Sequence, residues 1–479
     1  MIFFRSILYR KLFNLIRIIL ISLVTFDFLK TFLQGPADFF NWQRSWPLGK
    51  RKRFFENLFW AAAVAALLHL APCTKMGQQL LNETYDDLVE KDFQKTVAER
   101  GAVSDAIQLV TFDSSAYEEN PGRDFWTPRR SLGKAVIRSL KLGAKVVVAD
   151  IETDKPVPIK DENRAFLKLL DDAAVLAKKK DAVIILPRVR EVCGENLHSG
   201  YVCRFHDLLE KHSEVIRQGT PGIFRNPSDS KVRHFRLYEK DDKGSFTLSM
   251  SVLAAVYQWY GMKKGNEILE QTRARFMRDS WREILIPAPE GSEPIRIRRQ
   301  DAGSECLPAR YKFRIVPDSD LLFDMKRTSA ELDDTDPGSG IYYGKTIFIG
   351  SEHKEMEDIH ATPVGDMHGV FLLANGMNIF LKGEQLREVS LKYKYSAQAV
   401  LIVLAAMIFL YLDFAPAALT LTAILCILHK LLSVYVFTRW GLFLDFWLML
   451  AGIGIFENII GFQEILEDWV NHESHELHE

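Results

Sequence analysis

The stretch KVVVADI, Lys145–Ile151, decides the fold of this chain. Its consecutive apolar residues lack the alternation of a half-exposed strand and are typical of a strand covered on both faces. Just upstream, Ser131–Ala144 (SLGKAVIRSLKLGA) carries apolar residues at helical spacing, with Gly143 where a helix C-cap belongs. Another apolar run, Ile107–Phe112, precedes that helix. Strand, helix and strand in this order predict a βαβ unit with parallel strands.

Later segments extend this pattern. Glu162–Asp181 has the apolar spacing of a helix, and Ala182–Pro187 (AVIILP) follows it as an apolar strand. Gly344–Ser351 (GKTIFIGS) predicts a late strand, and Gly369–Gly383 (GVFLLANGMNIFLKG) predicts the helix that closes the domain. The sequence therefore predicts an α/β domain with a mainly parallel sheet.

Acidic and hydroxyl side chains stand where three of the predicted strands end. Ligands of parallel sheets bind beyond these carboxyl ends, where Asp113, Asp150 and Ser351 are expected. Together with Asp358, the aspartates would offer oxygen ligands suited to Mg²⁺ or Ca²⁺, although their spacing is not that of a calcium loop. For Asp150 and Asp113 we favour the structural alternative, in which the carboxylate accepts hydrogen bonds from backbone N–H groups of the next loop.

The stretch SEHKEMEDIHATP, Ser351–Pro363, concentrates polar residues, among them His353, Asp358 and His360, with His368 nearby. A serine nucleophile would require an elbow such as GxSxG, and a zinc site would require histidines at HExxH spacing. Neither pattern is present. We therefore interpret the stretch as an ordered polar loop over the sheet, with a pH-responsive histidine pair as the alternative.

The stretch FWTPRR, Phe125–Arg130, precedes the first predicted helix. One hypothesis places Arg129 and Arg130 against an anionic ligand at the helix N-terminus. The alternative is structural, with Thr127 as N-cap and a proline at the first helical position. Both interpretations remain open for the two arginines.

Five cysteines are present, and Cys193 and Cys203 flank the turn-forming stretch CGENLHSGYVC. In an oxidising compartment we expect a disulfide between them; the alternative is two free thiols. The CxxC spacing of metal sites is absent from the sequence.

Apolar residues concentrate at the two ends of the chain. Residues 396–412, 415–437 and 440–462 each approach the length that a helix needs to cross a bilayer. The connectors "DF" and "TR" are so short that tight helical hairpins are expected. Residues 54–72 predict another span, and the basic cluster GKRKR before it marks the cytoplasmic side. Residues 12–33 either span the membrane or lie as an amphipathic helix in the membrane–water interface, and we favour the interfacial position.

This topology divides the chain into five parts. Residues 1–53 form a cytoplasmic or interfacial amphipathic segment, 54–72 a transmembrane helix, and 73–391 an extracytoplasmic α/β domain. Residues 396–462 form three transmembrane helices and 463–479 an acidic cytoplasmic tail. Charged residues predicted to lie within the bilayer, Lys430, Asp445 and Glu457, are expected to pair across a helical hairpin; a proton or ion path is the alternative.

The residues also carry a family resemblance. VTFDSSAY, FWTPRRSLGKAVIRSLKLGAKVVVADI, DSKVRHFRLYEKDDKGSFTLSMSVLAAVY and GKTIFIGSEHKEMEDIHATPVGDMHGVFLLANGMNIFL resemble the CHASE2 family of bacterial extracytoplasmic sensor domains. The resemblance covers roughly Ile107–Phe462 and implies a mixed α/β sensor domain outside the cytoplasmic membrane, flanked by one membrane span before it and three after it. Members usually continue into a cytoplasmic output domain, whereas 17 residues follow Phe462 here. A separate chain is therefore expected to carry the output.

We expect a non-enzymatic sensory or ligand-binding module, with a structural subunit of a larger membrane complex as the alternative. A metal-dependent hydrolase is the third hypothesis, because of the strand-end acids. The net charge is −1 and there is no excess of basic residues, so the composition gives no support for a nucleic-acid partner. Expected partners are membrane lipids, an unidentified small ligand and a membrane or cytoplasmic output protein; a homo-oligomer stays open. No cofactor and no resident metal are expected.

Overall fold

The computed structural model describes residues 47–52, 54–59, 75–96, 103–113, 129–153, 156–157, 159–189, 199–226, 229–240, 246–277, 283–298, 309–310, 315, 326–352, 358–388, 403, 406–408, 410, 420, 433–440 and 442–443. The chain forms two compact units. The first comprises Met1–Leu81, Val389–Leu431 and Asp445–Glu479, and the second comprises Asn82–Glu388 and Leu432–Leu444.

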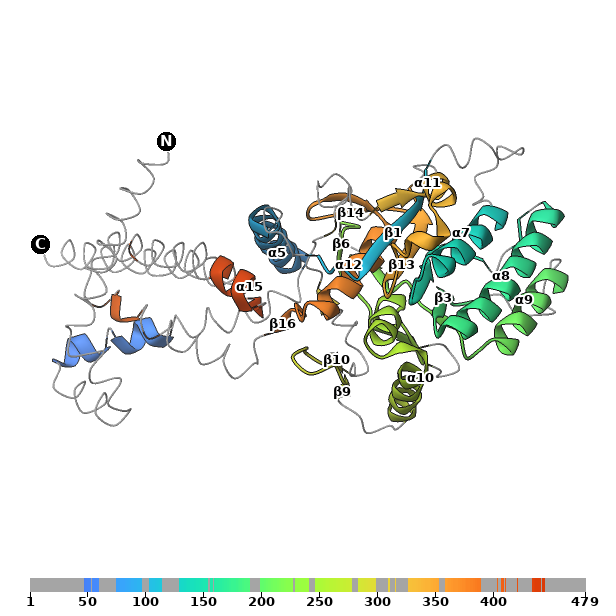
Figure 1. Ribbon diagram of the computed structural model, residues 1–479. Helices are drawn as coiled ribbons and strands as arrows, with labels where there is room; N and C mark the ends of the chain where they lie inside the picture. Colours follow the sequence, from blue (N-terminus) through green and yellow to red (C-terminus); the bar gives the residue numbers. More distant parts are fainter. Residues whose placement is uncertain are drawn as a thin grey trace, which may run out of the picture. The chain divides into compact units, whose positions relative to one another are not determined.

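A six-stranded sheet forms the centre of the second unit (Figure 1). Every neighbouring pair of its strands is parallel, as the apolar runs predict. The strand order is β12 (Lys326–Thr328), β1 (Ile107–Phe112), β13 (Thr346–Ser351), β2 (Val146–Ala149), β3 (Val183–Pro187) and β4 (Ile216–Gly219).

The late strand β13 occupies the middle of this sheet. It lies between β1 and β2, pairing Ile107 with Thr346 on one side and Thr346 with Val146 on the other. The predicted βαβ unit is present and its strands are parallel, but they are not direct neighbours. All residues of β1, β2 and β13 are buried, because helices cover both faces.

Helices pack on the two faces of the sheet (Figure 1). One side carries α7 (Arg129–Lys141) and α8 (Lys160–Lys180), with α9 (Ser199–Lys211) beside α8. The other side carries α10 (Met250–Phe276) and α12 (Gly369–Leu381), which contact each other. The chain leaves α7 through Gly143, which adopts a positive φ of 99° at the predicted C-cap.

Smaller elements surround this core. A three-stranded antiparallel sheet has the order β11 (Ala309–Arg310), β6 (Val232–Phe235), β5 (Ile223–Arg225). Two-stranded pairs are β7 (Tyr238–Lys240) with β8 (Phe246–Leu248), β9 (Glu283–Ile286) with β10 (Ile295–Arg298), β14 (Ile359–Thr362) with β15 (Gly365–His368), and β16 (Arg387–Glu388) with β17 (Leu442–Phe443). The remaining helices are α5 (Lys75–Thr96), α11 (Ser329–Asp334), η3 (Pro337–Ser339) and α15 (Val434–Trp440).

The predicted membrane spans fall mostly outside the described residues. Within the part of the chain that the structure describes, no helix has both the length and the apolar character needed to cross a bilayer. The connector "TR" does not interrupt the helix, because α15 continues through both residues and ends at Trp440. Leu442–Phe443, expected in a helix, instead pair with Arg387–Glu388 as parallel strands.

Candidate functional site

Two carboxyl groups converge on the first residue of α12. Asp150 follows β2 directly, and Asp358 directly precedes β14. A Cβ atom placed on Gly369 would lie 2.6 and 2.7 Å from the two carboxyl oxygens of Asp358 and 3.0 Å from Oδ2 of Asp150. Glycine is therefore required where α12 begins, since any side chain would displace one of the acids.

Asp358 holds the helix start. The backbone N–H of Gly369 donates to its Oδ2 at 3.1 Å, which satisfies one of the N–H groups that a helix leaves unpaired at its N-terminus. Asp358 thus accepts a backbone hydrogen bond at the start of α12.

Asp150 lies in a different electrostatic environment. Burial of its carboxyl group, and then the charge of Asp358, raise the pKa of Asp150 well above its ordinary value. Two carboxyl groups this close do not both ionise at the pH where a solvent-exposed aspartate does. The pair therefore retains a proton into a pH range where isolated aspartates have lost theirs.

His360 links this pair to the neighbouring sheet. It is buried, and Nε of Arg225 donates to its Nδ1 at 3.1 Å. Its Nε2 lies 3.1 Å from Oδ1 of Asp358. Because arginine has no acceptor, Nδ1 must be unprotonated, and the ring proton of the neutral form is on Nε2, facing Asp358.

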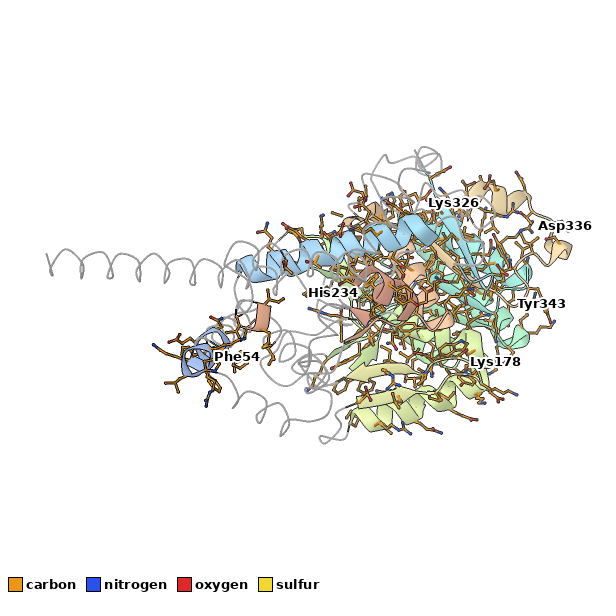
Figure 2. The ribbon with its side chains drawn as sticks, turned by 90° about the vertical axis from the view of Figure 1, so that its left-hand side faces the viewer. Phe54, Lys178, His234, Lys326, Asp336 and Tyr343 are labelled. Carbon is orange, nitrogen blue, oxygen red and sulfur yellow. The ribbon has the colours of Figure 1, made fainter. Side chains whose placement is uncertain are left out.

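A second histidine and an ion pair complete the cluster. His368 is the last residue of β15, and burial lowers its pKa, outweighing the opposing charges of Glu352 and Asp358. Glu352, which follows β13, pairs with Nζ of Lys326 at 2.7 Å; Lys326 is labelled in Figure 2. The Asp150–Asp358 pair, His360, His368, Arg225, Glu352 and Lys326 are called the sheet-edge cluster below.

The other predicted strand-end residues lie at the same edge. Phe112 is in register with Ser351, and the N–H of Glu352 donates to the carbonyl of Phe112 at 3.0 Å. Asp113 follows Phe112, and Ser351 is buried. Parallel pairing thus brings the ends of β1, β13 and β2 together, as their common direction predicts.

The two arginines at the start of α7 both contact α8. It is buried in the first turn of α7, and its guanidinium carbon lies 5.7 Å from the ring centroid of Phe166 in α8. The next residue, Arg130, contacts Glu162 of α8 through its backbone N–H at 2.8 Å. These contacts join α7 to α8, and anion binding by the two arginines stays a prediction.

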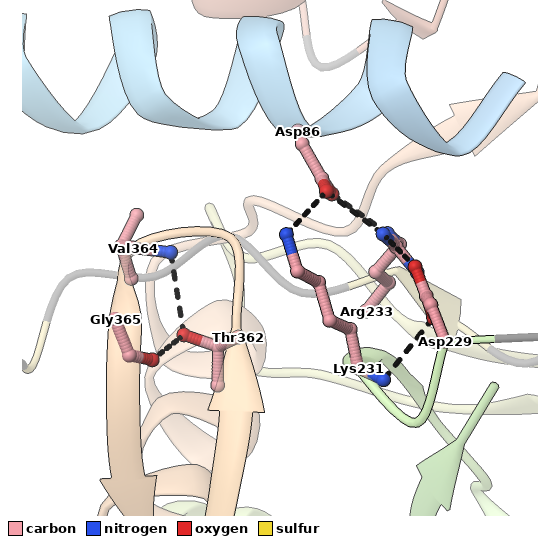
Figure 3. A network of polar contacts seen from close by, with 7 residues as sticks. All are labelled: Asp86, Asp229, Lys231, Arg233, Thr362, Val364 and Gly365. Atoms are coloured by element: carbon pink, nitrogen blue, oxygen red, sulfur yellow. Dashed lines mark hydrogen bonds and ion pairs between the residues drawn. The ribbon is translucent and has the colours of Figure 1, made fainter. Parts of the chain in front are cut away.

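The expected polar loop is wrong in its second half. Residues 353–357 lie outside the described residues, whereas Asp358 leads into the hairpin β14–β15. Thr362 fixes the turn: its hydroxyl donates to the carbonyl of Gly365 and accepts from the N–H of Val364 (Figure 3). Gly365 adopts a φ of 113°, which favours glycine.

A buried ion network that the sequence did not indicate connects α5 to the same region (Figure 3). Arg233 in β6 is 2% exposed and donates to both carboxyl oxygens of Asp86 in α5, at 2.7 and 2.8 Å. It also donates to Asp229 at 2.6 Å. Strand β6 pairs with β5, which ends in Arg225, the partner of His360. A continuous series of contacts thus runs from α5 to the start of α12.

The remaining predicted residues are only partly covered. Cys203 is disulfide-bonded, but Cys193 lies outside the described residues, so their pairing stays a prediction. Cys203 lies within α9 and not after a turn, because the helix already begins at Ser199. Lys430, Asp445 and Glu457 also fall outside the described ranges. Among the residues that are described, no group of three or more His, Cys, Asp or Glu side chains is arranged to hold a metal ion.

Comparison with known families gives one match. The model of the CHASE2 domain matches residues 60–412, which include the whole sheet and both helical layers. Comparisons with curated proteins and with solved structures found no match. CHASE2 domains are extracytoplasmic sensor domains, and a mixed α/β domain with a mainly parallel sheet fits that family. The chain belongs to the CHASE2 domain family.

Proposed function

We propose that this protein is a non-enzymatic sensor anchored in the bacterial cytoplasmic membrane, with its α/β domain outside the cytoplasm. The observation that supports this most strongly is the position of the Asp150–Asp358 pair at the first residue of α12. Proton uptake by this pair is the proposed input. Movement of α12 is the proposed response, and a separate protein carries the output.

The charge of the pair matters to the helix because both acids contact its start. Protonation removes the repulsion between Asp150 and Asp358 and weakens the favourable interaction of a carboxylate with the helix N-terminus. The same change acts on His360, whose Nε2 faces Asp358. A charge change at this one position therefore alters the contacts of α12, β14 and, through Arg225, β5.

Helix α12 is joined to neighbouring segments by buried hydrogen bonds, so a change at its start reaches those segments. Its buried amides bind backbone on both sides: Asn375 forms two hydrogen bonds with Ile315, at 2.9 and 2.7 Å, and Asn378 accepts from the N–H of Ser104 at 2.9 Å. In α10, the Ser251 hydroxyl donates to the carbonyl of Leu373 at 2.8 Å. Beyond α12 the chain enters β16 and then the segment predicted to hold the three closing spans.

Hydrogen exchange of the purified full chain, followed by mass spectrometry across a pH series, tests this proposal. After correction for the intrinsic pH dependence of exchange, α12 should change its protection as the Asp150–Asp358 pair titrates. The Asp150→Asn variant should remove that change. Asp366→Asn, which alters an exposed acid in β15, is the matched control and should behave as the unmodified chain does.

Two outcomes would contradict the proposal. One is an α12 whose protection does not respond to pH, and the other is an unchanged response in Asp150→Asn. Stoichiometric co-purification with partner proteins, without any pH response, would instead favour the alternative of a fixed subunit in a membrane complex.

A further inference from the structure

A cavity lies at the edge of the central sheet, on the side of β4. Its volume is about 490 Å³, within the range of about 300–1,000 Å³ typical of small-molecule sites. Residues of α9, β4, β8 and α10 line it, so it is built from elements separate from the sheet-edge cluster. None of the residues assigned to that cluster lines the cavity.

Part of the cavity wall is apolar, and two aromatic rings contribute to it. Phe246 of β8 and Phe276 of α10 stack with their ring centroids 4.9 Å apart and their planes inclined by 17°. Tyr238 lies behind both rings, with centroids 5.6 and 5.3 Å away. Leu209, Leu253 and Leu269 add aliphatic surface. Such walls favour a flat or chain-like hydrocarbon body over a small inorganic ion.

One cation in the cavity is held in place by two hydrogen bonds. Arg217 of β4 donates from Nε to the Tyr257 hydroxyl at 2.6 Å and from Nη1 to the carbonyl of Ser213 at 2.9 Å. Tyr257 is fully buried, and its hydroxyl in turn donates to Oδ1 of Asn266 at 2.6 Å. Arginine carries five N–H donors, so these two bonds fix the guanidinium and leave further donors for a ligand.

The anionic residues of the cavity are held less firmly. Glu270 lies 3.8 Å from Nη2 of Arg217, beyond hydrogen-bond distance, and its side chain is 62% exposed. An exposed pair of this kind contributes little and is readily displaced. Three arginines, Arg188, Arg217 and Arg273, line the cavity against two glutamates, Glu210 and Glu270. The charge that is fixed in position is therefore positive.

We propose that this cavity binds an organic monoanion with an apolar body, such as an arylalkanoate. The carboxylate takes the place of Glu270 on Arg217, where charge-assisted hydrogen bonds are stronger than neutral ones. The apolar body lies against the Phe246–Phe276 pair and the leucines. The site is a second input, independent of the proton uptake proposed for the sheet-edge cluster.

Isothermal titration calorimetry of the full chain with three probes tests the site: naphthylacetate, the uncharged naphthylethanol, and acetate. Naphthylacetate should bind at least about tenfold more tightly than either of the other two, because naphthylethanol lacks the carboxylate and acetate lacks the apolar body. Arg217→Gln should weaken naphthylacetate by at least about tenfold. Arg275→Gln, an exposed arginine on the same helix as Glu270 but outside the cavity lining, should leave the affinity unchanged.

The comparison of probes on the unmodified chain keeps the test decisive even where Arg217→Gln fails to fold. Equal affinities for naphthylacetate and naphthylethanol would overturn the proposal, as would equal affinities of the unmodified chain and a folded Arg217→Gln. Absence of naphthylacetate binding at millimolar concentration would overturn it too.

Discussion

Nε of Arg225 donates a hydrogen bond to Nδ1 of His360 at 3.1 Å, so a permanent cation faces the unprotonated nitrogen of a buried imidazole. A proton on Nδ1 would abolish this bond and place two cations in contact. In the neutral ring the proton is therefore on Nε2, directed at Asp358.

Nitrogen NMR of the chain labelled at histidine checks this tautomer. For His360, Nδ1 should show the shift of an unprotonated nitrogen and Nε2 that of a protonated one, with the signal assigned by its loss in His360→Gln. In Arg225→Ala the preference for this tautomer should weaken, because the donor is gone. A spectrum in which Nδ1 carries the proton would contradict the hydrogen-bond assignment.

Replacing Asp150 by asparagine should change how stability depends on pH. Burial and then the charge of Asp358 raise the pKa of Asp150, so the folded chain keeps a proton that the unfolded chain has released. That contribution to the free energy of unfolding is full below the ordinary aspartate pKa and is lost as pH rises through the raised one. Asp150→Asn should therefore gain melting temperature over the unmodified chain above this window. An equal or lower melting temperature there would contradict it.

Gly369→Ala should destabilise the domain. The added Cβ would approach the carboxyl oxygens of Asp358 to 2.6 and 2.7 Å, and overpacking of this kind costs about 1–3 kcal/mol in the free energy of unfolding. Gly200→Ala in α9 is the control, because its Cβ would meet no atom within 4 Å. Urea denaturation should separate the two variants; equal midpoints would show that the start of α12 is not tightly packed.

Arg233→Met should loosen α5. Burial lowers the pKa of Arg233, but the hydrogen bonds and charges of Asp86 and Asp229 outweigh it and leave the pKa above its ordinary value. Removing the guanidinium strands these acids and should cost about 3 kcal/mol. Lys231→Met removes a more exposed partner of Asp86, at 3.3 Å, and should cost about 1 kcal/mol or less. Increased hydrogen exchange in α5 of Arg233→Met alone would support the network; equal exchange in both variants would contradict it.

Local pattern predicted the strands and helices of the sheet, because a covered strand must be apolar along its length. The runs Ile107–Phe112, Val146–Ala149 and Thr346–Ser351 are all strands. Their order was not predictable, since an apolar run does not specify its neighbour. The hairpin β14–β15 was not predicted either. The charges of SEHKEMEDIHATP suggested a loop, although Ile359 and Met367 lie on paired strands.

The candidate site was predictable to the extent that parallel strands share a direction. That argument placed Asp113, Asp150 and Ser351 at one edge, where the structure has them. The contacts of Arg225 with His360 and of Arg233 with Asp86 join residues far apart in sequence, and no periodicity encodes them. The cavity beside β4 was not predicted because its lining residues are also far apart in the sequence.

The central position of β13 sets a condition on how the domain is made. Strands β1 and β2 are synthesised early but stay separated until Thr346–Ser351 emerges and fills the gap between them. Until then the edges of β1 and β2 that face β13 lack their native partner, and pairing across such a distance in sequence is slow. A nascent chain that ends before Thr346 therefore cannot complete the central sheet. Folding of the domain must wait until almost all of it has been synthesised.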